Sequence, residues 1–215
     1  MGRLIGIFGS AGFGREVMSL VCRQLGSKQP SGDIVFVVTD AEPRTKGLPV
    51  MDEANFLGSD RDRAFVIAIA DSAIRRRLHA HALASGAAAM DVRAASAEVL
   101  DEVTLGAGAI LCGHSSVTCG TRVGVGFHLN ISSYLAHDCI VGDFVTFGPN
   151  VVCSGNVVVE DGAYLGAGAL IRQGRPGAPL IIGAGAVVGM GAVVTKSVAP
   201  GAVVVGNPAR ALKKV

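Results

Sequence analysis

The sequence predicts two units of different class: a small parallel α/β unit over residues 1–95 and an all-β solenoid over residues 96–215. In the first ninety or so residues, short apolar runs alternate with helical patterns, which is typical of an α/β fold. From residue 99 an aliphatic or similar residue recurs at every sixth position, a period that neither a helix nor an alternating strand produces. The 30 glycines and the aromatic content of only 5% favour many tight turns between short strands.

The elements expected in the first unit follow from its apolar patterns. In order, they are a strand at 4–8, a helix at 15–26, strands at 34–38 and 65–70, and a helix at 72–86. The arginines at 75 to 77 are expected on a solvated face of the second helix. Surface positions are likewise expected for His79, His81 and His114.

The solenoid is predicted from a six-residue series that runs unbroken from Val99 to Ile171 and resumes at Ile182. Each hexapeptide is expected to form one short strand and one corner, with the aliphatic residue pointing inward. A small residue often follows the aliphatic one directly, and we expect it to permit the bend. Three hexapeptides then close one triangular coil of eighteen residues.

Composition excludes several classes of function. A net charge of +2 does not indicate a nucleic-acid or membrane-surface partner. Five cysteines without a C-x-x-C pair favour neither a disulfide framework nor a zinc site, so a reduced, cytoplasmic setting is expected. The start MGRLIGIFGSAG is too short and glycine-broken for a signal peptide, and no apolar run approaches the ~18 residues of a membrane span.

The stretch LAHDCIVGD at 135–143 contains a polar pair, His137 and Asp138, that the repeat itself does not require. A His-Asp dipeptide alone is a weak indication of catalysis, since most such pairs lie on solvated surfaces. Residues eighteen apart should stack on adjacent coils about 4.8 Å apart. Gly155 is therefore expected beside His137 on one side and Cys119 on the other.

The repeats, the closing phrase GNPAR at 206–210 and the N-terminal FGSAGFGREV at 8–17 together resemble the bacterial sugar-nucleotide acetyltransferases of the bacillosamine and perosamine pathways. The resemblance covers nearly the whole chain. It implies a Rossmann-like sugar-nucleotide-binding domain at 1–95 and a left-handed parallel β-helix at 96–215. It further implies an acetyl-CoA-dependent N-acetyltransferase without a metal, acting on a GDP- or UDP-linked 4-amino-4,6-dideoxyhexose, and a homotrimer with active sites between subunits.

The resemblance also assigns catalytic roles. His137 would take a proton from the sugar amine as the amine attacks the acetyl carbonyl, and Asp138 would strengthen that base. By its position, the Gly155 N–H is the candidate donor to the developing oxyanion.

The residues implied to contact acetyl-CoA are Thr146, Gly155, Ala167 and Arg210. Related enzymes often carry a histidine where this chain has Thr146. His128, one coil earlier, is either a functional substitute or a surface or trimer-contact residue. Arg210, Lys213 and Lys214 would meet CoA phosphates or form a solvated tail.

The glycine loop GSAGFG at 9–14 has the spacing G-x-x-G-x-G, which does not indicate bound NAD. Such a loop at a helix N-terminus still offers N–H groups to an anion. The resemblance implies that the sugar nucleotide is contacted from this loop and from the ends of the second and third strands. The residues concerned are Gly9, Ala11, Gly12, Phe13, Gly14, Thr39, Asp40, Ala70 and Asp71.

Five extra residues interrupt the hexapeptide series and are expected to form a loop within 172–181. The loop would cover the cofactor, grip a neighbouring subunit or be a tolerated insertion, and a similar loop in perosamine-type enzymes favours a GDP-sugar.

Two other functions of the protein stay open. One is O-acetylation of a sialic acid or of serine, although the glycine loop argues against a serine enzyme. The other is a non-catalytic β-helix that serves as a scaffold or nucleotide-binding regulator.

Overall fold

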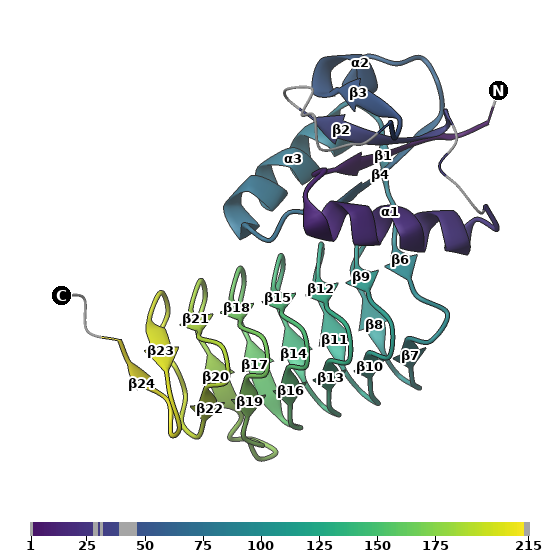
Figure 1. Cartoon of the computed structure of the whole chain (residues 1–215). Coiled ribbons are helices and arrows are strands. Elements are labelled where there is room, and N and C mark those ends of the chain that lie inside the picture. Colours follow the sequence, from purple (N-terminus) through teal and green to yellow (C-terminus); the bar gives the residue numbers. More distant parts are fainter. Residues whose placement is uncertain (1, 28–29, 31, 39–46, 213–215) are drawn as a thin grey trace. The chain divides into compact units, whose positions relative to one another are not determined.

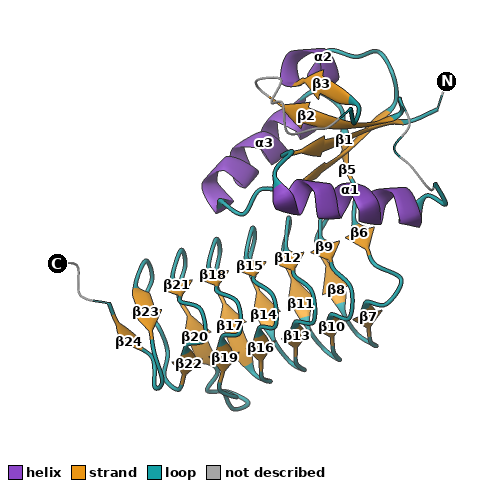
Figure 2. Cartoon of the chain, viewed as in Figure 1, coloured by secondary structure: helices purple, strands orange, loops and turns teal. Residues whose placement is uncertain are grey.

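A computed structural model describes residues 2–27, 30, 32–38 and 47–212. The chain divides into two compact units, residues 1–94 and residues 95–215. The helices of the described segments all belong to the first unit (Figure 2). Within those segments, no helix is both long and apolar enough to cross a bilayer.

The first unit is built on a parallel sheet with the strand order β3-β2-β1-β4-β5. Its strands are β1 (Leu4–Phe8), β2 (Ile34–Val38), β3 (Val50–Asp52), β4 (Arg63–Ile67) and β5 (Ala88–Ala89). The next strand of the chain, β6 (Val92–Arg93), belongs to another sheet. Its helices are α1 (Gly12–Gln24), α2 (Glu53–Leu57) and α3 (Ser72–Ala84). The central strands are buried along almost their whole length. Apart from Arg63 at the start of β4, they are apolar, as is typical of a parallel sheet that is covered on both faces.

Both β1 and β2 have the predicted bounds, but other boundaries differ from the prediction. Helix α1 begins at Gly12 rather than residue 15, so the second half of the glycine loop is already helical. Strand β4 spans 63–67 rather than 65–70 because it pairs with β1 from Leu4↔Arg63 to Phe8↔Ile67 and ends where its partner ends. The sequence pattern does not predict β3 and α2, which are too short to show a period.

The strand order reverses at β1. From β1 the chain proceeds to β2 and β3 on one side and then returns to β4 on the other. The carboxyl ends of β1 and β4 therefore border the position where open α/β sheets place ligands. Gly9, directly after β1, has a φ of 98°, and a Cβ there would lie 3.0 Å from the Ala68 carbonyl oxygen after β4.

The prediction of a solvated arginine face on α3 holds for Arg76 and Arg77, which are exposed, but not for Arg75. Its side chain is only 1% exposed. Its Nη1 donates to the carbonyl oxygens of Ile69 at 2.7 Å and Ala70 at 3.1 Å. Burial lowers the pKa of Arg75 to about 10, opposed by the nearby charge of Asp71. The guanidinium is buried because it binds the carbonyls that the turn after β4 leaves without strand partners.

The second unit is a parallel β-helix with three faces, whose successive coils are stacked side by side in Figure 1. The first face holds β7 (Glu98–Val99), β10 (Ser116–Val117), β13 (Tyr134–Leu135), β16 (Val152–Cys153), β19 (Leu170–Ile171) and β22 (Val193–Val194). The second holds β8 (Thr104–Leu105), β11 (Arg122–Val123), β14 (Ile140–Val141), β17 (Val157–Val159) and β20 (Leu180–Ile182). The third holds β9 (Ile110–Leu111), β12 (His128–Leu129), β15 (Thr146–Phe147), β18 (Tyr164–Leu165), β21 (Val187–Val188), β23 (Val203–Val205) and the antiparallel β24 (Arg210–Ala211).

The hexapeptide series fixes the register of these coils. Leu135 pairs with Val117 and Cys153, each eighteen residues away. From Leu111 to Val194, every predicted inward position is buried, with exposures of 0 to 7%. Mostly parallel sheets with few helices fit the left-handed β-helix that the resemblance implies.

The bends differ from the prediction. At the corners, the residue with left-handed backbone stands three places after the inward residue, as at Gly120 (φ 69°), Asp138 (φ 57°) and Asn156 (φ 58°). The small residue directly after the inward one has another role: a Cβ at Gly142 would lie 2.7 Å from the Asp161 backbone nitrogen on the next coil. It permits close stacking of coils, not the bend.

The loop between Ile171 and Ile182 lengthens one coil. Ile171 pairs with Val194, 23 residues away instead of eighteen. At its tip, Arg175 and Ala178 exchange backbone hydrogen bonds of 3.1 and 2.9 Å. The added residues thus form a short hairpin-like excursion, and the stacking resumes beyond it.

Candidate active site

His137 and Asp138 lie at the corner between β13 and β14, where the first and second faces meet. The residues that flank the pair, Ala136 and Cys139, are buried at 3% and 0%. The side chains of His137 and Asp138 are 48% and 62% exposed. Asp138 supplies the left-handed residue of this corner, a conformation that short polar side chains tolerate better than most. The fold therefore presents this pair on the outside of the corner.

The two side chains interact directly. His137 Nδ1 lies 2.8 Å from Asp138 Oδ2. Because an ionised carboxylate only accepts hydrogen bonds, Nδ1 carries the proton and donates it. In the neutral imidazole the lone pair is then on Nε2. This arrangement leaves Nε2 as the atom that can accept a proton.

The backbone of the pair is held by the coils on either side. The Asp138 N–H donates to the Cys119 carbonyl oxygen at 3.0 Å, and the Asn156 N–H donates to the His137 carbonyl oxygen at 3.1 Å. Sequence reasoning placed Cys119 beside His137 but missed Asn156. The signal was present, since Asn156 stands eighteen residues after Asp138.

Gly155 lies directly against the imidazole. A Cβ at this position would be 2.6 Å from both Cε1 and Nε2 of His137. The Gly155 carbonyl oxygen accepts the Gly174 N–H at 3.0 Å, whereas its own N–H donates to no acceptor in the described segments. The corner thus combines a proton acceptor with a backbone donor that has no partner, the two elements that acyl transfer requires.

Two cysteines pack under this corner. Cys139 Sγ donates to the Ser154 carbonyl oxygen at 3.4 Å, and all five cysteines of the chain are free. The hydrogen bond from Cys153 lowers the pKa of Cys139 against the opposing effect of burial. The same hydrogen bond, and then burial, raises the pKa of Cys153. Both thiols are fully buried and fill the interior of the coil.

The glycine loop forms the start of α1. The N-cap residue Ala11 makes no side-chain capping bond, no acidic residue is present in the first turn, and Ala11 and Gly12 are exposed. The exposed start of α1 thus presents the positive end of the helix dipole, which favours an anion. Gly14 is required by packing, since a Cβ there would lie 2.7 Å from the Gly9 carbonyl carbon.

The other residues predicted to contact a nucleotide have mixed outcomes. Ala70 and Asp71 do not end a strand, because β4 stops at Ile67. Asp71 instead caps α3 by accepting the Ile74 N–H at 2.8 Å. Thr39 and Asp40 lie outside the described residues.

Comparison with known proteins places the chain. No family model matches it. The chain is 44% identical to the GDP-perosamine N-acetyltransferase of Escherichia coli O157:H7 over 98% of its own length and 97% of that protein. Among solved structures it is similar to WeeI from Acinetobacter baumannii AYE, with 45% identity, a TM-score of 0.93 and coverage of 98% and 100% of the two chains. The acetyltransferase domain of PglB from Neisseria gonorrhoeae FA1090, in complex with acetyl coenzyme A, is 26% identical with a TM-score of 0.86, covering 99% and 100%.

The chain belongs to this family of sugar N-acetyltransferases. It is an acyltransferase, as the sequence predicts. The described residues hold no cluster of three or more His, Cys, Asp or Glu side chains that could bind a metal.

The residues that the family resemblance assigns to acetyl-CoA are not all near the catalytic corner. Gly155 is, but Thr146 lies on β15, Ala167 follows β18 and Arg210 lies on β24, and these three strands belong to the third face. In a three-sided coil the corner between the first and second faces is opposite the third face. Within one chain of this sugar N-acetyltransferase, these residues therefore do not come together with His137.

His79, which is expected at the surface, and His128, for which a surface or trimer-contact position is one of two alternatives, are both buried. His128 pairs with Thr146 between adjacent coils, and their exposures are 0% and 4%. An outward position on a strand therefore does not guarantee solvent contact. His79 is 8% exposed because it packs edge-on against Phe65, with ring centroids 5.3 Å apart.

Proposed function

We propose that this protein transfers the acetyl group of acetyl-CoA to the amino group of a nucleotide-linked 4-amino-4,6-dideoxyhexose, with GDP-perosamine as the first substrate to test. The observation that carries the proposal is the corner where the imidazole of His137 lies against both Asp138 and Gly155. The proposal is supported by the 44% identical relative, a GDP-perosamine N-acetyltransferase, and by the similar domain that holds acetyl coenzyme A.

His137 acts as the general base. Its Nε2 accepts a proton from the sugar amine as the nitrogen forms a bond to the thioester carbonyl carbon. The Gly155 N–H donates to the carbonyl oxygen as that oxygen gains negative charge. When the C–S bond breaks, the departing thiolate takes the proton from the imidazolium, giving free CoA and the N-acetylated sugar. Asp138 holds the Nδ1–H tautomer throughout these steps.

The first unit serves as a Rossmann-like domain that binds the sugar nucleotide. This part of the proposal is supported by the reversal of strand order at β1 and by the exposed N-terminus of α1 next to it. Gly9, Ala11, Gly12, Phe13 and Gly14 form that edge. Ala70 and Asp71 border it after β4, and Thr39 and Asp40 follow β2 in the sequence.

The enzyme works as a homotrimer with its active sites between subunits. One supporting observation is the distance between the catalytic corner and the third face, since one acetyl-CoA can contact both only if a second copy supplies one of them. Of the third-face residues, Arg210 is exposed and Ala167 is half-buried, so these two are better placed than the buried Thr146.

A second observation is the apolar surface on both sides of the His137 corner. Tyr134, Val152 and Leu170 on the first face are 37 to 44% exposed, and Ile140 and Ile181 on the second face are 49% and 38% exposed. Rows of exposed apolar side chains are typical of interfaces. A neighbouring subunit on this surface would also shield the half-exposed His137 from water.

The free cysteines fit a reducing, cytoplasmic setting.

The test is a thiol-release assay with acetyl-CoA and a panel of GDP- and UDP-linked 4-amino sugars, followed by mass spectrometry of the product. We expect acetylation of the amine and the highest kcat/KM with a GDP-linked sugar. Absence of turnover with every amino sugar would overturn the proposal. Sedimentation of the purified protein tests the trimer separately, and a monomer with full activity would contradict the shared site.

A further inference from the structure

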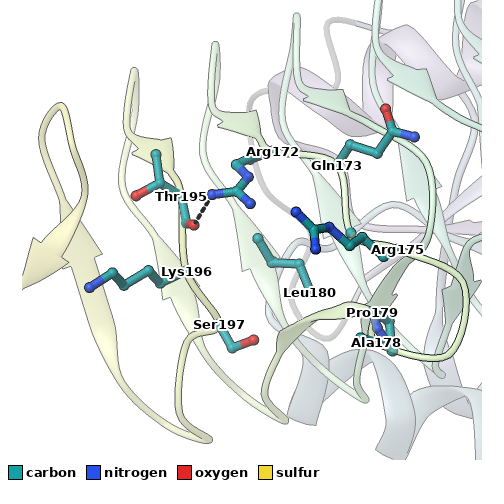
Figure 3. A pocket seen from close by; sticks show the side chains of 10 residues that line it. Arg172, Gln173, Arg175, Ala178, Pro179, Leu180, Thr195, Lys196 and Ser197 are labelled. Carbon is teal, nitrogen blue, oxygen red and sulfur yellow. Dashed lines mark hydrogen bonds between the residues drawn. The ribbon is translucent and has the colours of Figure 1, made fainter.

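The loop that lengthens one coil of the β-helix forms a basic pocket of about 250 Å³. Arg172, Gln173 and Arg175 line it from the loop, and Thr195, Lys196 and Ser197 line it from the following coil. Figure 3 shows the Arg172 guanidinium directed toward Thr195, and the Arg175 side chain extending from the loop toward the side where Arg172 lies. Arg172 is held in place by its Nη1, which donates to the Thr195 carbonyl oxygen at 3.4 Å.

The positive charges of this pocket are not neutralised by the protein. In the described segments none of Arg172, Arg175 and Lys196 forms an ion pair with a carboxylate. In the sequence, no Asp or Glu follows Asp161, whereas six Lys or Arg residues do. Cations gathered without counter-charges repel one another, and an anionic ligand relieves that repulsion. Two guanidinium groups with hydroxyls beside them suit the several oxygens of a phosphate.

The pocket is tied to the catalytic corner through the backbone. At one end of the loop, the Gly174 N–H donates to the Gly155 carbonyl oxygen at 3.0 Å. At the other end, the Leu180 N–H donates to the Asn156 carbonyl oxygen at 3.3 Å. Gly155 contacts the imidazole and Asn156 anchors the His137 carbonyl, so the loop stands one coil beyond the reacting atoms. An anion here lies on the order of one to two strand spacings of ~4.8 Å from Gly155.

We infer that Arg172 and Arg175, with Lys196 at the rim, form a binding site for a phosphate or pyrophosphate group of one of the two substrates. The inference rests on the proposed function and deepens it, because acetyl-CoA and a sugar nucleotide both carry pyrophosphate. The pocket is smaller than a site for a whole drug-sized ligand and suits one such group. The insertion therefore contributes a substrate-positioning site in addition to the hexapeptide repeat.

The experiment compares Arg172→Gln/Arg175→Gln with wild type, and Arg77→Gln, at an exposed arginine of α3, is the matched control. KM values are measured for acetyl-CoA, 3′-dephospho-acetyl-CoA, acetyl-pantetheine and the sugar nucleotide. We expect KM for the substrate whose phosphate is bound to rise about tenfold, with kcat changed less. The control should leave every KM within about twofold of wild type.

These KM measurements distinguish the two substrates, acetyl-CoA and the sugar nucleotide, as the source of the bound phosphate. A rise for acetyl-CoA that vanishes with acetyl-pantetheine assigns the pocket to CoA, and the dephospho compound separates the 3′-phosphate from the pyrophosphate. A rise for the sugar nucleotide assigns the pocket to that substrate. Unchanged KM values for both substrates overturn the inference.

Calorimetry with CoA, GDP and inorganic pyrophosphate tests the pocket without turnover. The double variant should lose affinity for the same ligand and for pyrophosphate, and the loss should be smaller at high salt, where the attraction is screened. If the wild type binds these ligands, the double variant does not, and neither acetylates any sugar, the proposed function is refuted and the pocket is supported. Equal binding by the wild type and the double variant would refute the pocket alone.

Discussion

Two corners of the β-helix carry an exposed histidine, and only one of them has the arrangement of a base. At His137 the imidazole stands one place before the left-handed residue, Asp138, and its Nδ1 contacts that carboxylate. At His114 the histidine is itself the left-handed residue, with a φ of 56°, and its backbone N–H donates to Ser96 Oγ at 3.1 Å. The difference shows that position within the hexapeptide, not residue type alone, determines what a histidine on this scaffold can do.

The largest effect is expected when the imidazole of His137 is removed, and removal of the His114 imidazole is the comparison. His137→Ala should lower kcat by about 10² to 10⁴, the range for loss of a general base. His114→Ala should stay near wild type because its imidazole has no partner in the described part of the chain. Steady-state thiol release measures both. Equal losses in the two variants would mean that the corner of His137 has no special role.

A smaller effect is expected from filling the space beside each histidine. Gly155→Ala places a Cβ 2.6 Å from Nε2 of His137, so the ring must move, and we expect kcat to fall about 10²-fold through lost orientation. Gly113→Ala, beside His114, meets only Ser96 Oγ at 3.3 Å and should cost little. Thermal denaturation of both variants separates misfolding from lost chemistry. A fully active, folded Gly155→Ala enzyme would show that the ring does not need its observed position.

The smallest effect concerns the acid. Asp138→Asn keeps the size of the side chain but removes the charge, and we expect kcat to fall about tenfold because solvent already screens this half-exposed group. The control is Asp143→Asn at the next corner, which keeps an oxygen to accept the Val125 N–H, bonded at 2.8 Å in the native chain. Measurement of kcat across pH checks whether Asp138→Asn changes the shape of the pH profile, which Asp143→Asn should leave as in the wild type. Unchanged kcat would limit Asp138 to a structural role.

The repeating part of the molecule was the easier part to predict. An inward residue at each sixth position determines both the coil and its register, so His137, Cys119 and Gly155 could be aligned by counting alone. The sequence pattern attributes the bend to the small residue directly after the inward one, which is wrong. Glycines that permit close stacking and residues with left-handed backbone are both frequent in the repeat, so frequency does not tell them apart. Only φ values distinguish a residue such as Gly142 from one such as Asp138.

Burial of polar side chains was the harder part to predict. Arg75 stands among three consecutive arginines, and nothing in that run distinguishes the one that binds the carbonyls after β4. His128 and Thr146 occupy outward positions, yet they are buried. The sequence likewise does not show that the cations of the pocket lie together, because this depends on how the loop returns to the next coil. The lack of acidic residues after Asp161 is visible in the sequence.

The hydrogen bonds that join the two ends of the loop to Gly155 and Asn156 also make substrate affinity independent of catalysis. Each coil pairs only with its neighbours, so residues beyond Gly174 and before Leu180 can change in length or charge without shifting the coil that holds His137. Affinity for a substrate can therefore evolve at the loop tip while the chemistry stays constant. In an engineered enzyme, exchange of this segment alone would change substrate preference with the catalytic corner intact.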